Sequence, residues 1–333
     1  MAKDDSSYKW ARLSYFLPLL TPMAIIIAFV VFYRIFLFCD GSDAPCSLIK
    51  TTVLRAAVNK GNDTLVRNYV AKATWTLANG VHAITCLGAL LTGAVVMYQA
   101  LSDYGRRIRA LLIGLIIALA ANVSLAVALW FNQDTGSPAP QILRATVGQV
   151  LPTIFIYIRG FDALSLTSVL SLCCAACAVL WKRRPDEPQD QTELRKRLKL
   201  LRAVLFTSAG LLVVGVLRLS TTLSWGASFI PSDSEVGKFI GPLVSGIVSS
   251  LGTFYTLLMA GMYFPAVLLL RARVSELAQA AKPEAPDAWL SENGLALSFS
   301  AWLPRIVAIL APLMAGPFID IVKNLIPTSF GTG

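Results

Sequence analysis

Two residues of this 333-residue chain invite a chemical reading, because each lies inside a long apolar segment. His82, the only histidine, interrupts an otherwise uncharged run over 73–102, and Arg218 interrupts the apolar run over 203–225. A histidine changes charge near neutral pH and can carry a proton. A charge inside a membrane segment costs several kcal/mol unless it is paired, and such residues are functional candidates by default.

Each of the two residues has a structural alternative. His82 is either a proton carrier or a packed polar residue that bonds to a neighbouring helix. Arg218 is followed by the polar residues 220–222 and either binds an anion or gates a pore, or else reaches out to the headgroups on the outer side.

Small and hydroxyl-bearing residues recur at helical spacing in the apolar runs. Ser245 and Ser249 stand four apart in the run over 239–270, and they join His82 and Arg218 as candidates for lining a polar transport path. Small residues at this spacing also let helix backbones approach closely. We therefore expect a tight bundle, with further small or polar stripes at Ala89 and Gly93, and at Gly114, Ala118, Ala121 and Asn122.

The signatures of the common catalytic and cofactor sites are missing from the sequence. It contains no GxxxxGK[ST], HExxH or GxSxG motif, and a single histidine excludes bis-histidine heme and zinc sites with two histidines. The CCAAC stretch over 173–177 has no acidic residue or histidine nearby and is interpreted as close helix packing. We identify no catalytic, cofactor-binding or metal-binding residues, and we do not expect an enzyme.

Composition predicts an all-α, polytopic helical membrane protein. The chain is 56% hydrophobic and only 14% charged, whereas soluble domains carry about 25% charged residues. A bilayer core of about 30 Å needs roughly 20 apolar residues in a helix. Residues 1–270 are predicted to form a bundle of six transmembrane helices, with short interfacial or re-entrant helices and a possible seventh span. The expected spans are 13–36, 75–101, 109–132, 161–181, 201–224 and 243–270.

Lysine and arginine gather in the N-terminal tail, in the loop over 102–109, in the loop over 182–202 and at the start of the C-terminal tail. Six alternating spans place all four segments on one side, which is cytoplasmic by the positive-inside rule. We expect both termini in the cytoplasm and the inner (plasma) membrane of a bacterium as the location. The same rule explains the net charge of +10 without nucleic acid as a partner. Candidate contacts to anionic lipid are Arg195, Lys196, Arg197 and Lys199, although ordinary topology signalling is the favoured explanation of these residues.

Two segments are predicted on the outer side. Residues 38–72 form a loop in which apolar and basic residues alternate in blocks, and we expect two short amphipathic helices there, separated at Gly61-Asn62. Cys39 and Cys46 of this loop face an oxidising compartment and are candidates for a disulfide. The apolar stretch over 147–160 is too short to span and is interpreted as re-entrant or interfacial.

The C-terminal tail over 271–333 contains a hydrophobic helical segment at 299–326. One of its faces is bulky and the other is small rather than charged, so both faces are expected to be covered. Pro304 suits a helix start, and Pro312 and Pro317 predict a kink or break. A re-entrant or protein-buried helix is favoured over a seventh span.

Two functions fit these features. The first is a transport or pore-forming protein that moves a small solute or ion past His82, Arg218, Ser245 and Ser249. The second is a non-catalytic structural, regulatory or effector subunit of a larger membrane complex, which docks through its outer-loop helices and its tail. In either case we expect membrane lipids, and a second copy or another membrane protein, as partners.

Overall fold

The computed structural model describes residues 16, 18–22, 24–25, 62–102, 104–131, 154–181, 190–230, 234–281, 290 and 304–315. Within these ranges the chain is helical and contains no strand, so the all-α prediction is confirmed. The five long helices are α4 (Asn62–Ala100), α5 (Arg106–Phe131), α8 (Ile154–Leu180), α9 (Gln191–Ala227) and α10 (Glu235–Ala281).

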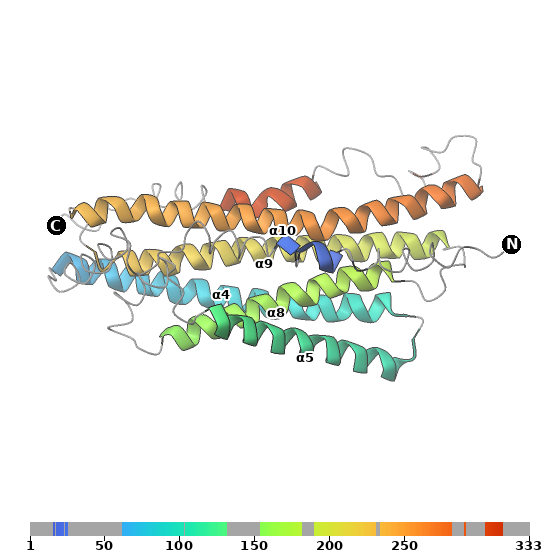
Figure 1. The fold of residues 1–333 in the computed structure, drawn as a ribbon, viewed down its shortest axis with the longest axis horizontal. Coiled ribbons are helices and arrows are strands. Elements are labelled where there is room, and N and C mark those ends of the chain that lie inside the picture. Colours follow the sequence, from blue (N-terminus) through green and yellow to red (C-terminus); the bar gives the residue numbers. More distant parts are fainter. Residues whose placement is uncertain are drawn as a thin grey trace.

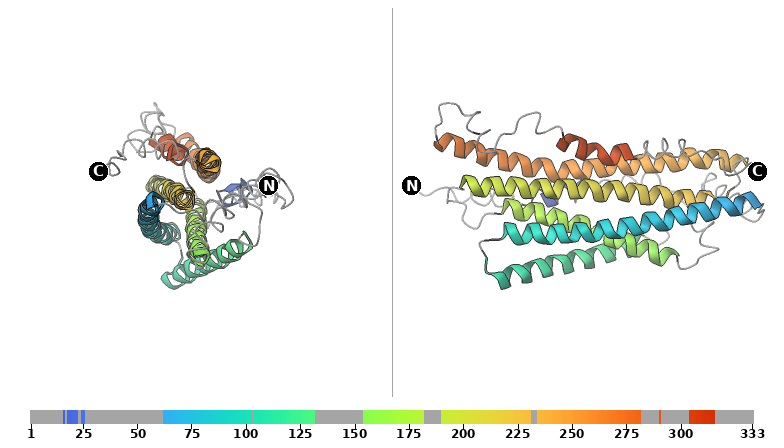
Figure 2. Two further views of the ribbon diagram at one scale, coloured as in Figure 1. Left: turned by 90° about the vertical axis from the view of Figure 1, so that its left-hand side faces the viewer. Right: turned by 180° about the vertical axis from the view of Figure 1, so that it is seen from behind.

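The five helices run side by side along one axis, and successive helices alternate in direction (Figure 1). α9 contacts α4, α8 and α10, whereas α5 lies at the edge and contacts α8 and α4. The end-on view of Figure 2 shows the same order, with α9 central. The residues most relevant to function therefore lie where α4, α8 and α9 meet.

All five helices are long and apolar enough to cross a membrane. This supports an integral membrane protein with five candidate spans in the described ranges, so the predicted number of six or seven is approximate. Of the predicted first span, only part of 16–25 is described. Its Ile25 contacts α10, because a Cβ at Gly261 would lie 2.6 Å from the Ile25 side chain.

Several helices extend further than the sequence predicted. α4 has 39 residues and α10 has 47, or about 58 and 70 Å at 1.5 Å per residue. The second amphipathic helix expected before residue 72 is instead the beginning of α4. Trp225 of α9 stabilises this N-terminal extension of α4. Its Nε1 donates to Asn68 Oδ1 at 2.8 Å, and the centroid of its ring lies 4.7 Å from the centroid of the Trp75 ring.

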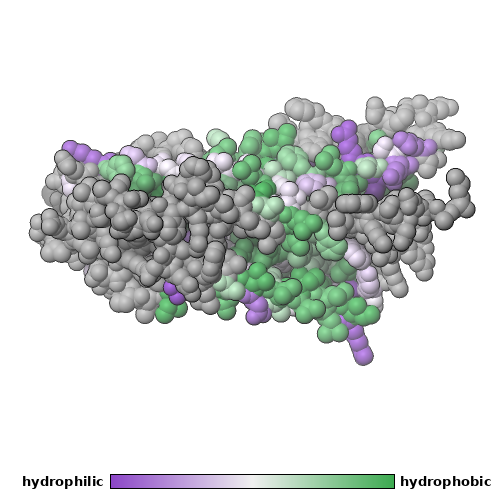
Figure 3. Space-filling model, in the orientation of Figure 1, coloured by the Kyte–Doolittle hydropathy of each residue, from purple (hydrophilic) through white to green (hydrophobic). Residues whose placement is uncertain are grey.

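The outward faces of the helices are apolar over the middle of the bundle. Figure 3 shows hydrophobic residues gathered there, with hydrophilic residues visible toward both ends. Leu77, Ile84 and Leu91 of α4 are all about 70% exposed, and an apolar stripe of this kind suits contact with lipid. This apolar surface over the middle of the bundle, the apolar belt, agrees with the assignment of α4 as a membrane span.

Small residues bring some helices close together, as predicted, but not all. Ala89 is fully buried, and a Cβ at Gly93 would lie 2.5 Å from Ser171 Oγ of α8. The predicted stripe on α5 instead faces outward, because the helix packs through its opposite face, which includes Ile113 and Ser124. The exposed residues of that stripe are Gly114, Ala118, Ala121 and Asn122.

The hydrophobic tail segment contains a short helix over Pro304–Ala315. It begins at the predicted proline and is about 18 Å long, too short to cross a bilayer core of about 30 Å. Its small face packs on α10, where a Cβ at Gly252 would lie 2.7 Å from the Pro312 carbonyl oxygen. Val307 and Met314 face outward. Within the described residues this supports a helix packed on protein by one face.

Candidate functional site

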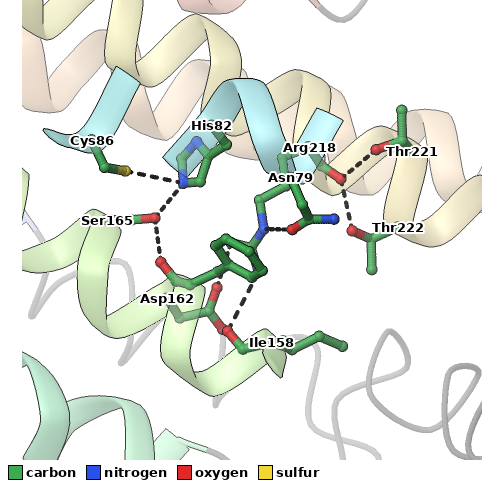
Figure 4. Close-up of polar contacts among 10 residues, drawn as sticks. Asn79, His82, Cys86, Ile158, Asp162, Ser165, Arg218, Thr221 and Thr222 are labelled. Atoms are coloured by element: carbon green, nitrogen blue, oxygen red, sulfur yellow. Dashed lines mark hydrogen bonds and ion pairs between the residues drawn. The ribbon is translucent and has the colours of Figure 1, made fainter. Parts of the chain in front are cut away.

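Arg218 is buried and holds three helices together through polar contacts (Figure 4). Its Nη1 lies 2.7 Å from Asp162 Oδ1 of α8, and its Nε donates to Asn79 Oδ1 of α4 at 3.1 Å. Its Nη2 also lies 3.4 Å from the Ile158 carbonyl oxygen. The guanidinium of Arg218 is therefore bonded within the bundle.

Asp162 is the more open member of the pair. Its side chain is 45% exposed, compared with 10% for Arg218. The carboxylate pairs with an arginine that is 56 positions away in the sequence. The network therefore has an exposed acidic end and a buried basic end.

His82 lies on the same face of α4 as Asn79 and is 1% exposed. Its Nε2 lies 2.5 Å from Ser165 Oγ, and this hydroxyl donates its hydrogen to the Phe161 carbonyl at 2.7 Å. Ser165 must then accept from Nε2–H, which leaves a lone pair on Nδ1. Nδ1 is buried and has no hydrogen-bond partner within the described part of the chain.

The surroundings of His82 join it to α9 and α10 as well. A Cβ at Gly215 of α9 would lie 3.3 Å from the Tyr255 ring and 3.9 Å from His82 Cε1. Because Gly215 has no side chain, both His82 and Tyr255 can pack against the α9 backbone at this position. Asn79, which accepts from Arg218, lies three residues before His82 on α4, so the two predicted residues lie in one region of the bundle.

The structure does not place the two predicted serines in the network of Figure 4. Ser245 and Ser249 are half-buried on α10. Their neighbours Val244 and Val248 pack against Val216 and Leu223, in an apolar cluster. We therefore build the candidate site on His82 and Arg218 without the serines.

The predicted lipid-contact residues at the start of α9 divide into two groups. Arg197 is buried: its Nη1 donates to the Val179 and Trp181 carbonyl oxygens at 2.6 Å each, and its Nη2 pairs with Glu193 at 2.6 Å. This corrects the expectation for Arg197, because its guanidinium caps the end of α8. The exposed residues that keep the expectation are Arg195, Lys196 and Lys199.

The remaining cysteine predictions have different outcomes. Cys39 and Cys46 lie outside the described residues. Cys173 and Cys177 are buried, and Cys173 Sγ lies 3.8 Å from Met262 Sδ of α10, as expected for close packing. Among the described residues, no group of histidine, cysteine and acidic side chains is arranged to hold a metal.

Sequence reasoning missed the partners that make the site. Asn79, His82 and Cys86 stand at steps of three and four, so α4 carries a polar face in an apolar run. Asp162 and Ser165 form the matching face of α8, three residues apart. Two such faces in neighbouring spans were the available signal, but sequence alone did not show that they meet.

This arrangement combines a half-exposed carboxylate, a buried guanidinium and a buried imidazole whose Nδ1 has no hydrogen-bond partner among the described residues. The guanidinium can bind an anion, the carboxylate can bind a cation, and the imidazole can take up a proton. No protein-family model matches the chain, and no curated protein and no solved structure matches it either.

Proposed function

We propose that this membrane protein transports a small ion or solute, and that the network of Asp162, Arg218 and His82 forms the outer part of its path. The observation that carries the proposal is the placement of two polar clusters side by side where α4, α8 and α9 meet. Arg218 pairs with the half-exposed carboxylate of Asp162, and the buried imidazole of His82 bonds to Ser165, three residues further along α8. An unsatisfied polar atom in an apolar interior costs about 1–3 kcal/mol. Within the described residues His82 Nδ1 is such an atom, and uptake of a proton or an ion at this nitrogen would remove the cost.

A second candidate is a non-catalytic subunit in which the same network only fastens three helices. It is supported by the three acceptors around Arg218: they bond to all three guanidinium nitrogens, and one of them is the carboxylate of Asp162. The two candidates make different predictions for function. Removal of the network would abolish flux in a transporter, and would change only stability in a scaffold.

We further propose that the end of the bundle at which α4 ends and α9 begins faces the cytoplasm. Arg106 and Arg107 lie at that end, as do the basic residues of early α9. The charge bias of short loops sets orientation in this way. Asp162 then opens toward the outside of the cell.

The test is flux through liposomes reconstituted with the purified full chain. Proton movement is followed with an entrapped pH-sensitive dye, and potassium and chloride currents are recorded in planar bilayers. We expect at least one of these fluxes to exceed that of protein-free membranes, and to be lost in His82→Gln and Arg218→Gln. Lys238→Gln, an exposed cation on α10, is the matched control and should retain it. If all three proteins and the parent chain carry no flux above the empty membranes, the transport proposal is wrong for these ions.

A further inference from the structure

A cluster of cations without acidic partners lies near the beginning of α9. Arg195, Lys199 and Arg202, together with Leu198, line a cavity of about 150 Å³. The cations stand at steps of four and three, so they share one face of the helix. The cavity is several times larger than the ~15 Å³ that one water requires, and it can hold a polyatomic anion.

Charge is unbalanced at this cavity. None of the three cations pairs with a carboxylate in the part of the chain that the structure describes. Arg202 Nε is buried and lacks a hydrogen-bond partner within the same ranges. Like charges at these helical spacings repel one another, and a bound anion would remove the repulsion.

A second helix adds positive charge beside Arg202. Arg305, in the helix over Pro304–Ala315, is buried, and its charge interacts with that of Arg202. The side chain of Tyr263 on α10 hydrogen-bonds to Arg305. Guanidinium groups offer paired donors that fit phosphate oxygens, so the cluster suits a phosphate group better than a simple halide.

The same face of α9 becomes apolar toward the middle of the bundle. Phe206 follows Arg202 by four residues and is exposed, and Gly210 follows by four more with open space beside it. Three cations followed by an apolar stripe match the layout of a phospholipid, with its phosphate at the interface and its acyl chain along the helix. We propose that Arg195, Lys199 and Arg202 bind the phosphate of one anionic phospholipid, whose acyl chain lies along Phe206 and Gly210.

This site is more specific than general attraction to an anionic membrane, and a matched variant separates the two. Lys199→Gln/Arg202→Gln removes two cations of the cavity. Lys196→Gln removes an exposed cation of the same helix that does not line it. Binding of phosphatidylglycerol to the detergent-solubilised full chain is measured by native mass spectrometry, with glycerol 3-phosphate as the soluble probe that carries the same phosphate without acyl chains.

We expect a loss of roughly thirty-fold in phosphatidylglycerol affinity for the double variant, from about fivefold per cation, and less than twofold for Lys196→Gln. Equal losses in both variants would reduce the site to general electrostatics and overturn the proposal. Equal binding of glycerol 3-phosphate would show that the ligand is a soluble phosphate and not a lipid. If the double variant fails to fold, Arg195→Gln/Lys199→Gln changes two exposed residues and gives the same test.

Discussion

The guanidinium of Arg218 and the carboxylate of Asp162 lie 2.7 Å apart, and the arginine is buried while the aspartate is 45% exposed. This asymmetry predicts that removing one charge of the pair lowers stability more than removing the other. Asp162→Asn leaves a buried cation without its counter-ion, whereas Arg218→Met leaves a carboxylate that solvent can reach. We expect Asp162→Asn to lower the free energy of unfolding by about 1–3 kcal/mol, less than for a fully buried pair because Asp162 is half-exposed.

The measurement is unfolding in detergent micelles, followed by circular dichroism, for both single variants and the double variant. Asp162→Asn/Arg218→Met should recover part of the stability lost in Asp162→Asn. A larger loss for Arg218→Met than for Asp162→Asn would contradict the assigned burial of the two charges.

Arg197 is predicted to contribute more to stability than the neighbouring cation, Lys196. It donates to two carbonyl groups at the end of α8, and hydrogen bonds from charged groups contribute about 1.5–3 kcal/mol. Arg197→Ala should destabilise the chain by at least about 2 kcal/mol, and Arg197→Lys should not restore it, because an ammonium cannot reproduce the planar fork. The control is Lys196→Ala, at an exposed position, which should stay within about 0.5 kcal/mol of the parent. Thermal unfolding of the four proteins in one detergent decides the point.

Gly252 is a position of close approach between α10 and the Pro304–Ala315 helix. A Cβ there would meet the Pro312 carbonyl oxygen at 2.7 Å, whereas nothing lies within 4 Å of a Cβ at Gly246 on the same helix. Gly252→Ala should therefore cost about 1–3 kcal/mol through overpacking. Gly246→Ala should be neutral or slightly stabilising, because alanine favours the helix over glycine. Comparable midpoints of thermal unfolding for the two variants would show that the short helix does not pack on α10 in this way.

Ser165 is expected to affect function more than stability. Its hydroxyl accepts from His82 Nε2 and so fixes which ring nitrogen carries the proton. Ser165→Ala should reduce any proton flux at least tenfold while costing only about 1 kcal/mol of stability. Ser124→Ala removes another buried hydroxyl, on α5, that bonds only within its own helix, and its flux should match that of the parent chain. Equal flux in the two serine variants would remove Ser165 from the path.

The sequence was most informative about features set by local physics. Long uncharged runs predicted one end of three spans to within three residues: the expected spans end at 101, begin at 109 and end at 181, and the helices end at Ala100, begin at Arg106 and end at Leu180. The fourth of these helices, α9, begins ten residues before the predicted span over 201–224: Asp190 occupies its N-cap position, and Glu193 in its first turn bonds to Arg197.

The features that the sequence did not predict depend on which helix faces meet. Hydropathy does not distinguish a lipid-facing helix surface from a packed one, so the stripe at Gly114 and Ala118 was expected inside the bundle and lies outside it. The partner of Arg218 was missed for the same reason. Two charges that pair within one helix stand three or four residues apart in the sequence, and this spacing can be recognised. Two charges that pair between different helices have no characteristic sequence separation.

Water access to Ser165 tests the account most directly. The measurement is the labelling of single cysteines by a membrane-impermeant thiol reagent, added from outside to a variant that lacks the native cysteines. The path predicts that Ser165→Cys, one turn below exposed Asp162, is labelled, and that Arg218→Cys is labelled as well. Leu91→Cys is the control, because it is exposed on the apolar belt and should face lipid rather than water. Resistance of Ser165→Cys and Arg218→Cys to the reagent, at the level of Leu91→Cys, would contradict a water-accessible path and leave the network as a fastening between helices.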